Sequence, residues 1–91
     1  MGTDEHLRFA DNAFYFANSY FNRLDEITEK EKISALNYAH TARIHYDFAS
    51  NDTNEDILKE LIEKCDHLII SFYQKLNFEE IADWYKHTTH Y

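Results

Sequence analysis

Apolar residues recur at helical spacing along the first quarter of the chain. Leu7, Phe14 and Phe21 stand seven residues apart, and other apolar side chains fill in beside them, which predicts a helix over residues 4–24. Its apolar arc covers about 180°, whereas a single core-facing stripe needs little more than about 100°. The excess is aromatic, so this helix is expected to meet a second partner. The residues assigned to an interface in a homo-oligomer are Phe9, Phe16 and Tyr20.

The segment 29–49 is predicted to be a central helix because apolar residues surround it almost completely. One side carries small residues at helical spacing, which permit close approach of a neighbouring helix; this ladder consists of Ala35, Ala39, Ala42, Tyr46 and Ala49. The opposite side carries Ile33, Leu36 and Ile44. The polar stretch 49–54 that follows is expected to be a loop.

The second half of the chain predicts one long and one short helix. Residues 54–76 show a conventional apolar face with Cys65 at its middle, while Ile70 falls on the polar side and is expected to be exposed. Over residues 78–87 a short helix would turn four side chains inward, namely Phe78, Ile81, Ala82 and Tyr85.

Helix boundaries must come from capping residues, since the chain has no Pro, no Val and a single Gly. Three capping patterns are present: Thr28 with Glu31, Thr53 with Asp56, and Asn77 with Glu80. The sequence therefore predicts an all-α fold, with residues 1–91 forming one domain. Its expected architecture is a bundle of three long helices (about 4–24, 29–49 and 54–76) with a short C-terminal fourth helix (about 78–87).

Charge and cysteine content narrow the class of protein. With 17 acidic against 9 basic residues the net charge is −8, which repels phosphate backbones and argues against direct nucleic-acid binding. No apolar run approaches the about 20 residues of a membrane span, and the first residues lack the basic and apolar regions of a signal peptide. The single Cys65 excludes an internal disulfide, so a cytoplasmic location is expected.

Polar residues interrupt the apolar surface of segment 29–49. His40, Arg43 and Asp47 follow one another at helical spacing beside Tyr46, and Arg43 and Asp47 are placed to form an ion pair. A charge pair on an apolar face is costly, which suggests a ligand pocket or a specific contact with a partner. The alternative is an amphipathic edge at which Arg43 covers apolar neighbours and keeps its guanidinium in water.

Metal and catalytic chemistry receive little support. Asp83, His87 and His90 share one side of an extended final helix and are the best metal-ligand candidates, but chain ends of this kind are more often solvated. Cys65 lies on an apolar face, where a thiol is not activated, and a chain with one Gly has no phosphate-binding loop. Neither a cofactor nor enzymatic activity is predicted.

Three functional hypotheses remain. The preferred one is a small acidic helical module that binds or inhibits another macromolecule and self-associates, because aromatic residues make up 16% of the chain and dominate interfaces. A second is an acidic inhibitor that mimics nucleic acid, encoded by a phage or another mobile element. The third is an oligomeric protein that binds a nucleotide or another anion through Arg43.

Overall fold

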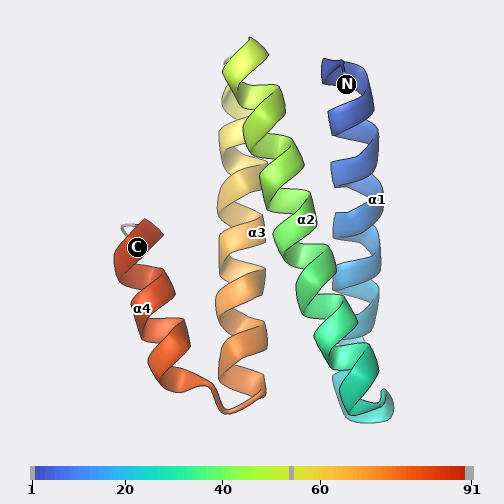
Figure 1. Cartoon of the computed structure of the whole chain (residues 1–91), viewed down its shortest axis with the longest axis vertical. Coiled ribbons are helices and arrows are strands. Elements are labelled where there is room, and N and C mark those ends of the chain that lie inside the picture. Colours follow the sequence, from blue (N-terminus) through green and yellow to red (C-terminus); the bar gives the residue numbers. More distant parts are fainter. Residues whose placement is uncertain (1, 54, 90–91) are drawn as a thin grey trace.

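A computed structural model describes residues 2–53 and 55–89, and these residues are almost entirely helical (Figure 1). The elements are α1 (Thr3–Asn22), a short 3-10 turn η1 (Leu24–Glu26), α2 (Glu29–Thr53), α3 (Asp56–Lys75) and α4 (Glu79–Thr89). No strand occurs within these ranges. The predicted all-α class is therefore confirmed, and the helix packing is compatible with a bundle.

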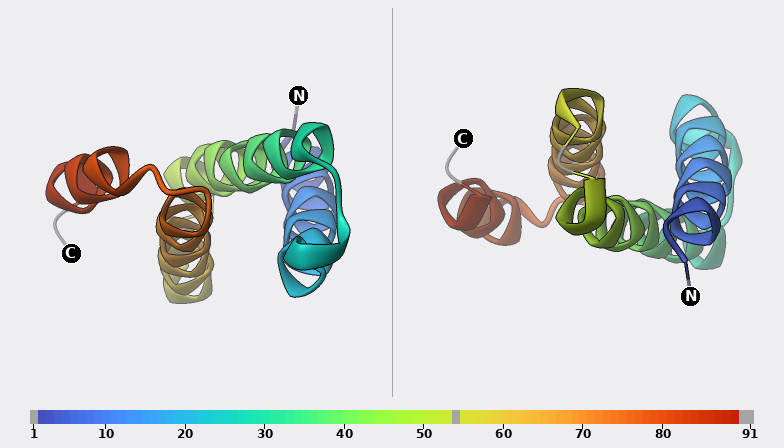
Figure 2. Two further views of the ribbon diagram at one scale, coloured as in Figure 1. Left: turned by 90° about the horizontal axis from the view of Figure 1, so that it is seen from below. Right: turned by 90° about the horizontal axis from the view of Figure 1, so that it is seen from above.

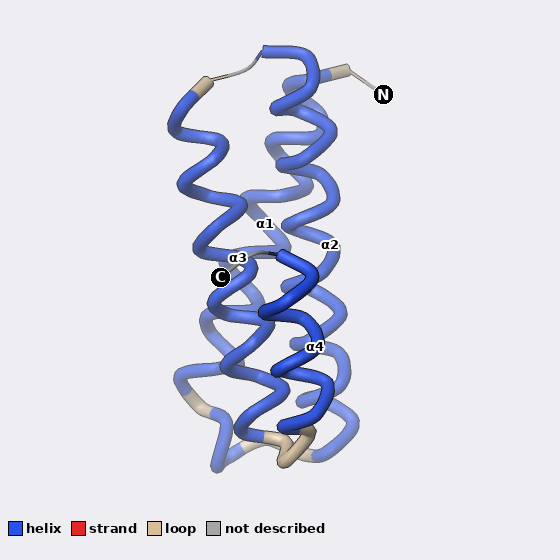
Figure 3. The backbone as a smooth tube through the Cα atoms, turned by 90° about the vertical axis from the view of Figure 1, so that its left-hand side faces the viewer, coloured by secondary structure: helices blue, strands red, loops and turns tan. Residues whose placement is uncertain are grey.

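Helix α2 lies at the centre of the arrangement. It packs along α1 on one side and along α3 on the other, whereas α1 and α3 touch each other little. Viewed along the helices, α1 and α3 project from the same side of α2 (Figure 2). Helix α4 packs on α3 and covers only the half of it nearest the α3–α4 turn (Figure 3). The predicted central position of segment 29–49 is correct.

Alanine brings α1 and α2 together. On α1 the buried side chains are Ala10, Ala13 and Ala17. On α2 they are the predicted ladder, Ala35, Ala39, Ala42, Tyr46 and Ala49. Apart from Tyr46, these side chains are small, so the two helices approach closely and leave little room for further large side chains in the seam. The bulky aromatic side chains of α1 consequently lie to either side of this seam.

The start of α2 is set by the predicted capping box. The Glu31 amide donates to Thr28 Oγ1 at 3.1 Å, and the Thr28 amide donates to Glu31 Oε1 at 3.1 Å. Hydrogen bonds from the Thr28 backbone and hydroxyl lower the pKa of Glu31. This reciprocal pair fixes the sharp reversal between α1 and α2.

The predicted boundary between α2 and α3 is wrong. Helix α2 continues past residue 49 to Thr53, whose hydroxyl donates to the Ala49 carbonyl as a residue inside a helix does. Helix α3 begins at Asp56 with Glu55 in the capping position and no side-chain cap. Without Gly or Pro in 49–53, nothing ends α2 where its apolar pattern stops.

Asn77 ends α3 and does not cap α4, contrary to prediction. Its backbone is left-handed, with φ of 64°, a conformation that Asn tolerates better than most residues. The Asn77 amide donates to the Gln74 carbonyl, and the Phe78 amide donates to the Tyr73 carbonyl at 2.8 Å. These two bonds form a Schellman motif. The chain reverses here and α4 begins at Glu79.

Helix α4 corrects two further expectations about burial. Ile70 is buried, because it belongs to the apolar cluster that Ala82 and Tyr85 of α4 complete. Conversely, Phe78 and Ile81 are exposed although they were expected to face inward. The side of α3 that its own periodicity marks as polar is therefore an internal contact with α4.

Candidate functional site

Two histidines of α2 stand at the centres of different side-chain clusters. His40 and His45 are five residues apart, which turns them about 140° from each other on the helix. His40 reaches α3 and α4, whereas His45 reaches α1. We call the first group the Asp66 cluster: His40, Arg43, Asp66, Tyr73 and Tyr85. We call the second group the outer face: His6, Phe9, Phe16, Tyr20, Tyr38, His45 and Phe48.

The Asp66 cluster ties three helices together around one carboxylate. Asp66 on α3 is only 2% exposed. Arg43 Nε on α2 donates to Asp66 Oδ1 at 2.6 Å, and the Tyr85 hydroxyl on α4 donates to the same oxygen at 2.6 Å. The predicted pair of Arg43 with Asp47 is wrong, because Arg43 turns to Asp66 and Asp47 stays exposed at the surface.

The electrostatics of the Asp66 cluster favour fixed protonation states. Burial opposes the charge of Arg43, but the hydrogen bond and charge of Asp66 outweigh it and raise the Arg43 pKa. Burial, aided by the Arg43 charge, lowers the pKa of His40, whose Nε2 lies 3.0 Å from the Tyr73 hydroxyl. Burial and the bond to Asp66 raise the pKa of Tyr85. No buried side-chain polar atom of the described residues lacks a partner, so the cluster is internally satisfied.

The residues predicted to form a ligand or partner site are divided among different environments. His40 and Arg43 belong to the Asp66 cluster, and Asp47 is exposed. Tyr46 is 1% exposed, and its hydroxyl donates to Asp11 Oδ1 at 2.5 Å. Tyr46 is therefore a core residue that presents no surface to a partner.

Asp66 is the residue that sequence reasoning missed. A signal was available, because Ile62, Ile69 and Ile70 stand four residues before it and three and four residues after it. A carboxylate within such an apolar group needs a buried cationic or hydrogen-bonding partner. Arg43 on α2 is likewise a charge set among apolar residues.

The outer face consists of aromatic rings that α1 and α2 stack against each other. Phe9 lies on His45 with ring centroids 5.6 Å apart, and Phe16 lies on Tyr38 at 5.4 Å. Tyr20 continues the row beside Tyr38. The structure thus brings the three predicted interface residues onto one surface. What the sequence did not reveal is the contribution of α2, which supplies Tyr38, His45 and Phe48.

Much of this aromatic surface is open to solvent. Phe9 is 51% exposed, Phe16 46% and Phe48 52%. The positions that helical spacing places beside these rings are also uncharged: Asn12, Ser19, Ser34 and Thr41. The middle of this two-helix surface is therefore uncharged, although the protein has a net charge of −8. Charged side chains lie towards its ends, where Glu5 and Arg8 line a hollow with Phe9. Arg23 lies over the Tyr20 ring, and Asp52 accepts a hydrogen bond from Thr3.

The remaining candidate residues do not come together in a site. Cys65 is buried, and burial raises its pKa to about 12, so the prediction that it is a core residue is confirmed. Of the predicted metal candidates, Asp83 and His87 are exposed on α4, and His90 lies outside the described residues. Among the described residues no three His, Cys, Asp or Glu side chains gather around a common point.

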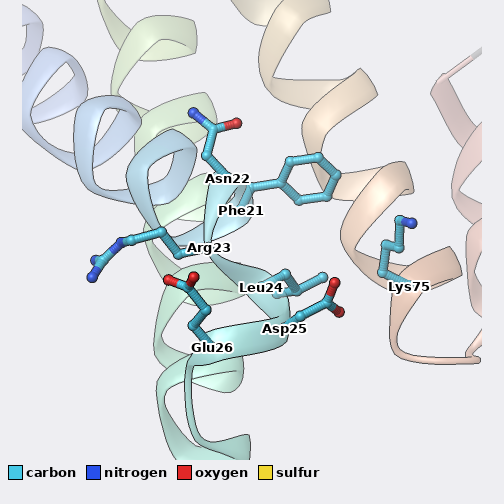
Figure 4. A pocket seen from close by; sticks show the side chains of 7 residues that line it. All are labelled: Phe21, Asn22, Arg23, Leu24, Asp25, Glu26 and Lys75. Atoms are coloured by element: carbon cyan, nitrogen blue, oxygen red, sulfur yellow. The ribbon is translucent and has the colours of Figure 1, made fainter.

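A hollow of about 300 Å³ lies at the turn between α1 and α2 (Figure 4). Its wall comes mainly from consecutive residues of the turn, Phe21 to Glu26, with Lys75 of α3 on the far side. The Arg23 side chain extends away from Lys75, so the two cations do not converge on one point (Figure 4). This hollow has the form of an open turn and not of a ligand site.

Comparisons with known proteins add no relative from which a function can be transferred. The sequence matches no protein-family model, and neither a curated protein nor a solved structure is similar to it. Within the described residues, no helix combines the length and apolar character that crossing a membrane requires. The function must accordingly be inferred from the geometry of the chain itself.

Proposed function

We propose that this chain is a small acidic helical protein-interaction module that assembles with a second copy of itself through the outer face. The observation that carries the proposal is the row of half-exposed, uncharged aromatic rings across α1 and α2. Aromatic residues are enriched, and charged residues depleted, at the centres of protein interfaces. A buried and reduced Cys65 agrees with a cytoplasmic setting.

The size of the aromatic surface is adequate for the centre of an interface. Phe9, Phe16, Tyr38 and Phe48 together expose about 400 Å², taking about 200 Å² for each whole side chain. The largest apolar patch of a monomer is often functional at about 300–600 Å². A standard interface buries about 800 Å² on each partner, so the uncharged polar neighbours would supply the remainder.

Charge restricts where a second copy can dock. Two chains of net charge −8 repel each other over most of their surface. Pairing through the outer face would set its uncharged middle in one copy against the same region of the other. A two-fold dimer pairs the same surface of both chains. Aromatic rings lie at both ends of the row, so each end can pack against the opposite end of the other copy.

The other two hypotheses have less support. Ligand binding through Arg43 conflicts with the commitment of Arg43 Nε to Asp66 and with the contact of His40 to Tyr73. Mimicry of nucleic acid rests on net charge alone. Binding or inhibition of another macromolecule by the assembled module remains part of the proposal, with its partner to be identified.

The test is sedimentation equilibrium of the double variant Phe9→Gln with Phe16→Gln. Burying a Phe at an interface contributes about 2 kcal/mol, so the double variant should weaken association, raising the dissociation constant at least about thirtyfold. Helicity should be retained. The matched control is Ile57→Gln with Ile81→Gln, which removes two exposed apolar side chains on α3 and α4 and should leave association unchanged.

Two outcomes would contradict the proposal. An unmodified chain that sediments as a monomer up to about millimolar concentration would show that the outer face does not mediate self-association. Equal weakening by the test and control variants would show that association follows general hydrophobicity and not this surface.

A further inference from the structure

One end of the outer face holds a pair of histidines whose contact the aromatic stacking does not require. His6 lies near the start of α1 and His45 near the end of α2, and their Nδ1 atoms are 2.8 Å apart. The two rings are partly buried. This pair joins the open end of the α1–α2 hairpin, since the only covalent connection is the turn at the opposite end (Figure 1).

Each imidazole is held in place by a phenyl ring from the other helix. His6 is stacked on Phe48 with centroids 5.0 Å apart and planes inclined by 20°, and His45 is stacked on Phe9 at 5.6 Å and 24°. Two rings fixed by reciprocal stacking lose little further freedom on binding a common ligand. Pre-organisation of this kind lowers the entropic cost of binding.

The facing nitrogen atoms have two chemical options. In one, Nδ1 of one ring carries a proton and donates it to Nδ1 of the other. In the second, both rings carry their protons on Nε2, and the two Nδ1 lone pairs point at the same small volume. Neutral imidazole with a free lone pair is the commonest protein ligand for transition metals. The change between the two options is a tautomer shift in one ring and releases no net proton.

We propose that His6 and His45 bind a divalent transition-metal ion of the zinc or nickel type between their Nδ1 atoms. With Zn–N bonds of about 2.0–2.1 Å and a tetrahedral angle, the nitrogen atoms need to be about 3.3 Å apart. The observed spacing of 2.8 Å needs only a small outward rotation of the rings. Water completes the coordination, because the protein supplies two ligands.

The surroundings favour a cation at this position. The Thr3 hydroxyl donates to Asp52 Oδ2 at 2.7 Å, which places a carboxylate two turns beyond His45 on α2. The protein as a whole is also strongly acidic. Binding of the ion would clamp two helices at positions 39 residues apart in the chain and order the Phe9 and Phe48 end of the outer face.

The experiment measures the thermal midpoint of the full chain with Zn²⁺, Ni²⁺ or Mg²⁺, each at about 100 μM. For a dissociation constant of about 10 μM, Zn²⁺ and Ni²⁺ should raise the midpoint by about 7 °C. Mg²⁺, which prefers oxygen ligands, should not raise it. Nitrogen NMR signals of the His6 and His45 rings should shift with Zn²⁺ in the same concentration range.

Variants separate this pair from the other histidines. His6→Gln and His45→Gln should each weaken Zn²⁺ binding at least about tenfold, while the control His87→Gln with His90→Gln should retain it. Circular dichroism without metal verifies that each variant is folded. Loss of binding in the control but not in His6→Gln, or no response of the unmodified chain to Zn²⁺ and Ni²⁺, would overturn the proposal. The self-association experiment is done with a chelator present, so the two proposals fail independently.

Discussion

The two histidine clusters of α2 differ in what completes them. His40 lies against Tyr73 and Tyr85, next to an arginine whose charge a buried carboxylate neutralises. His45 lies against His6 and Phe9 on a surface where Phe9 and Phe48 remain half-exposed. Both clusters use aromatic rings and imidazole from the same helix, yet one is closed by a third and fourth helix and the other is not.

The two clusters contain similar residue types. What distinguishes the stabilising cluster from the candidate binding surface is that its side chains are more buried and its polar atoms have hydrogen-bond partners. The Asp66 cluster meets all its hydrogen-bonding requirements within the chain, so removing one member should reduce the stability of the monomer. The outer face has unsatisfied apolar area instead, so removing one member should reduce association.

The largest expected effect comes from Asp66→Asn. The variant keeps the shape of the side chain but leaves the charge of Arg43 without its partner. We expect the free energy of unfolding in urea to fall by about 2–3 kcal/mol, somewhat below the loss for a fully buried pair because Arg43 is partly solvated. The control Asp47→Asn should change it by less than about 0.5 kcal/mol. Equal effects would show that Asp66 is not the centre of the cluster.

A smaller loss is expected from Tyr85→Phe. This change removes one hydrogen bond to Asp66 and preserves the packing of α4 on α3. The free energy of unfolding should decrease by about 1 kcal/mol. Tyr15→Phe, which alters an exposed residue of α1, serves as the matched control and should be neutral. If the two variants are equally stable, the Tyr85 hydroxyl does not help to hold α4.

The smallest effect concerns pH. Because the pKa of His40 is lowered in the folded protein, its neutral form contributes stability that is fully present above pH 6.5. That contribution is lost as the pH falls from 6.5 through the folded-state pKa. The variant His40→Gln should therefore show a shallower decline in unfolding free energy between pH 7 and pH 5 than the unmodified chain, by urea denaturation at each pH. An unchanged slope would mean that His40 is as freely protonated in the folded chain as in the unfolded one.

Periodicity was sufficient to predict the helices but not their ends. The predicted α1 and α3 differ from the observed ones by a few residues, because long apolar stripes define a helix over most of its length. Thr53 and Asn77 were assigned to caps on residue type, yet one lies inside α2 and the other ends α3. Thr and Asn occur inside helices as well as at either end of them, and the surrounding backbone determines which of these positions each one occupies.

Residues of the candidate sites could be predicted only where the sequence pattern of a single helix was sufficient to identify them. Phe9 and Phe16 could be assigned to a surface because the apolar arc of α1 is wider than one core contact needs. The burial of Asp66 and Ile70 depends on where α4 lies, and the His6–His45 contact depends on the register of α1 against α2. Neither can be read from the periodicity of a single helix.

The most direct test of the division between the two clusters is the dependence of the thermal midpoint on chain concentration, in the presence of a chelator. Association through the outer face predicts that raising the concentration a hundredfold increases the midpoint of the unmodified chain by about 5 °C. Tyr85→Phe should lower the midpoint at every concentration and keep that dependence. Phe9→Gln with Phe16→Gln should abolish the dependence and keep the midpoint of the dilute chain. A double variant that instead loses stability equally at all concentrations would show that the outer face stabilises the monomer and would contradict the account.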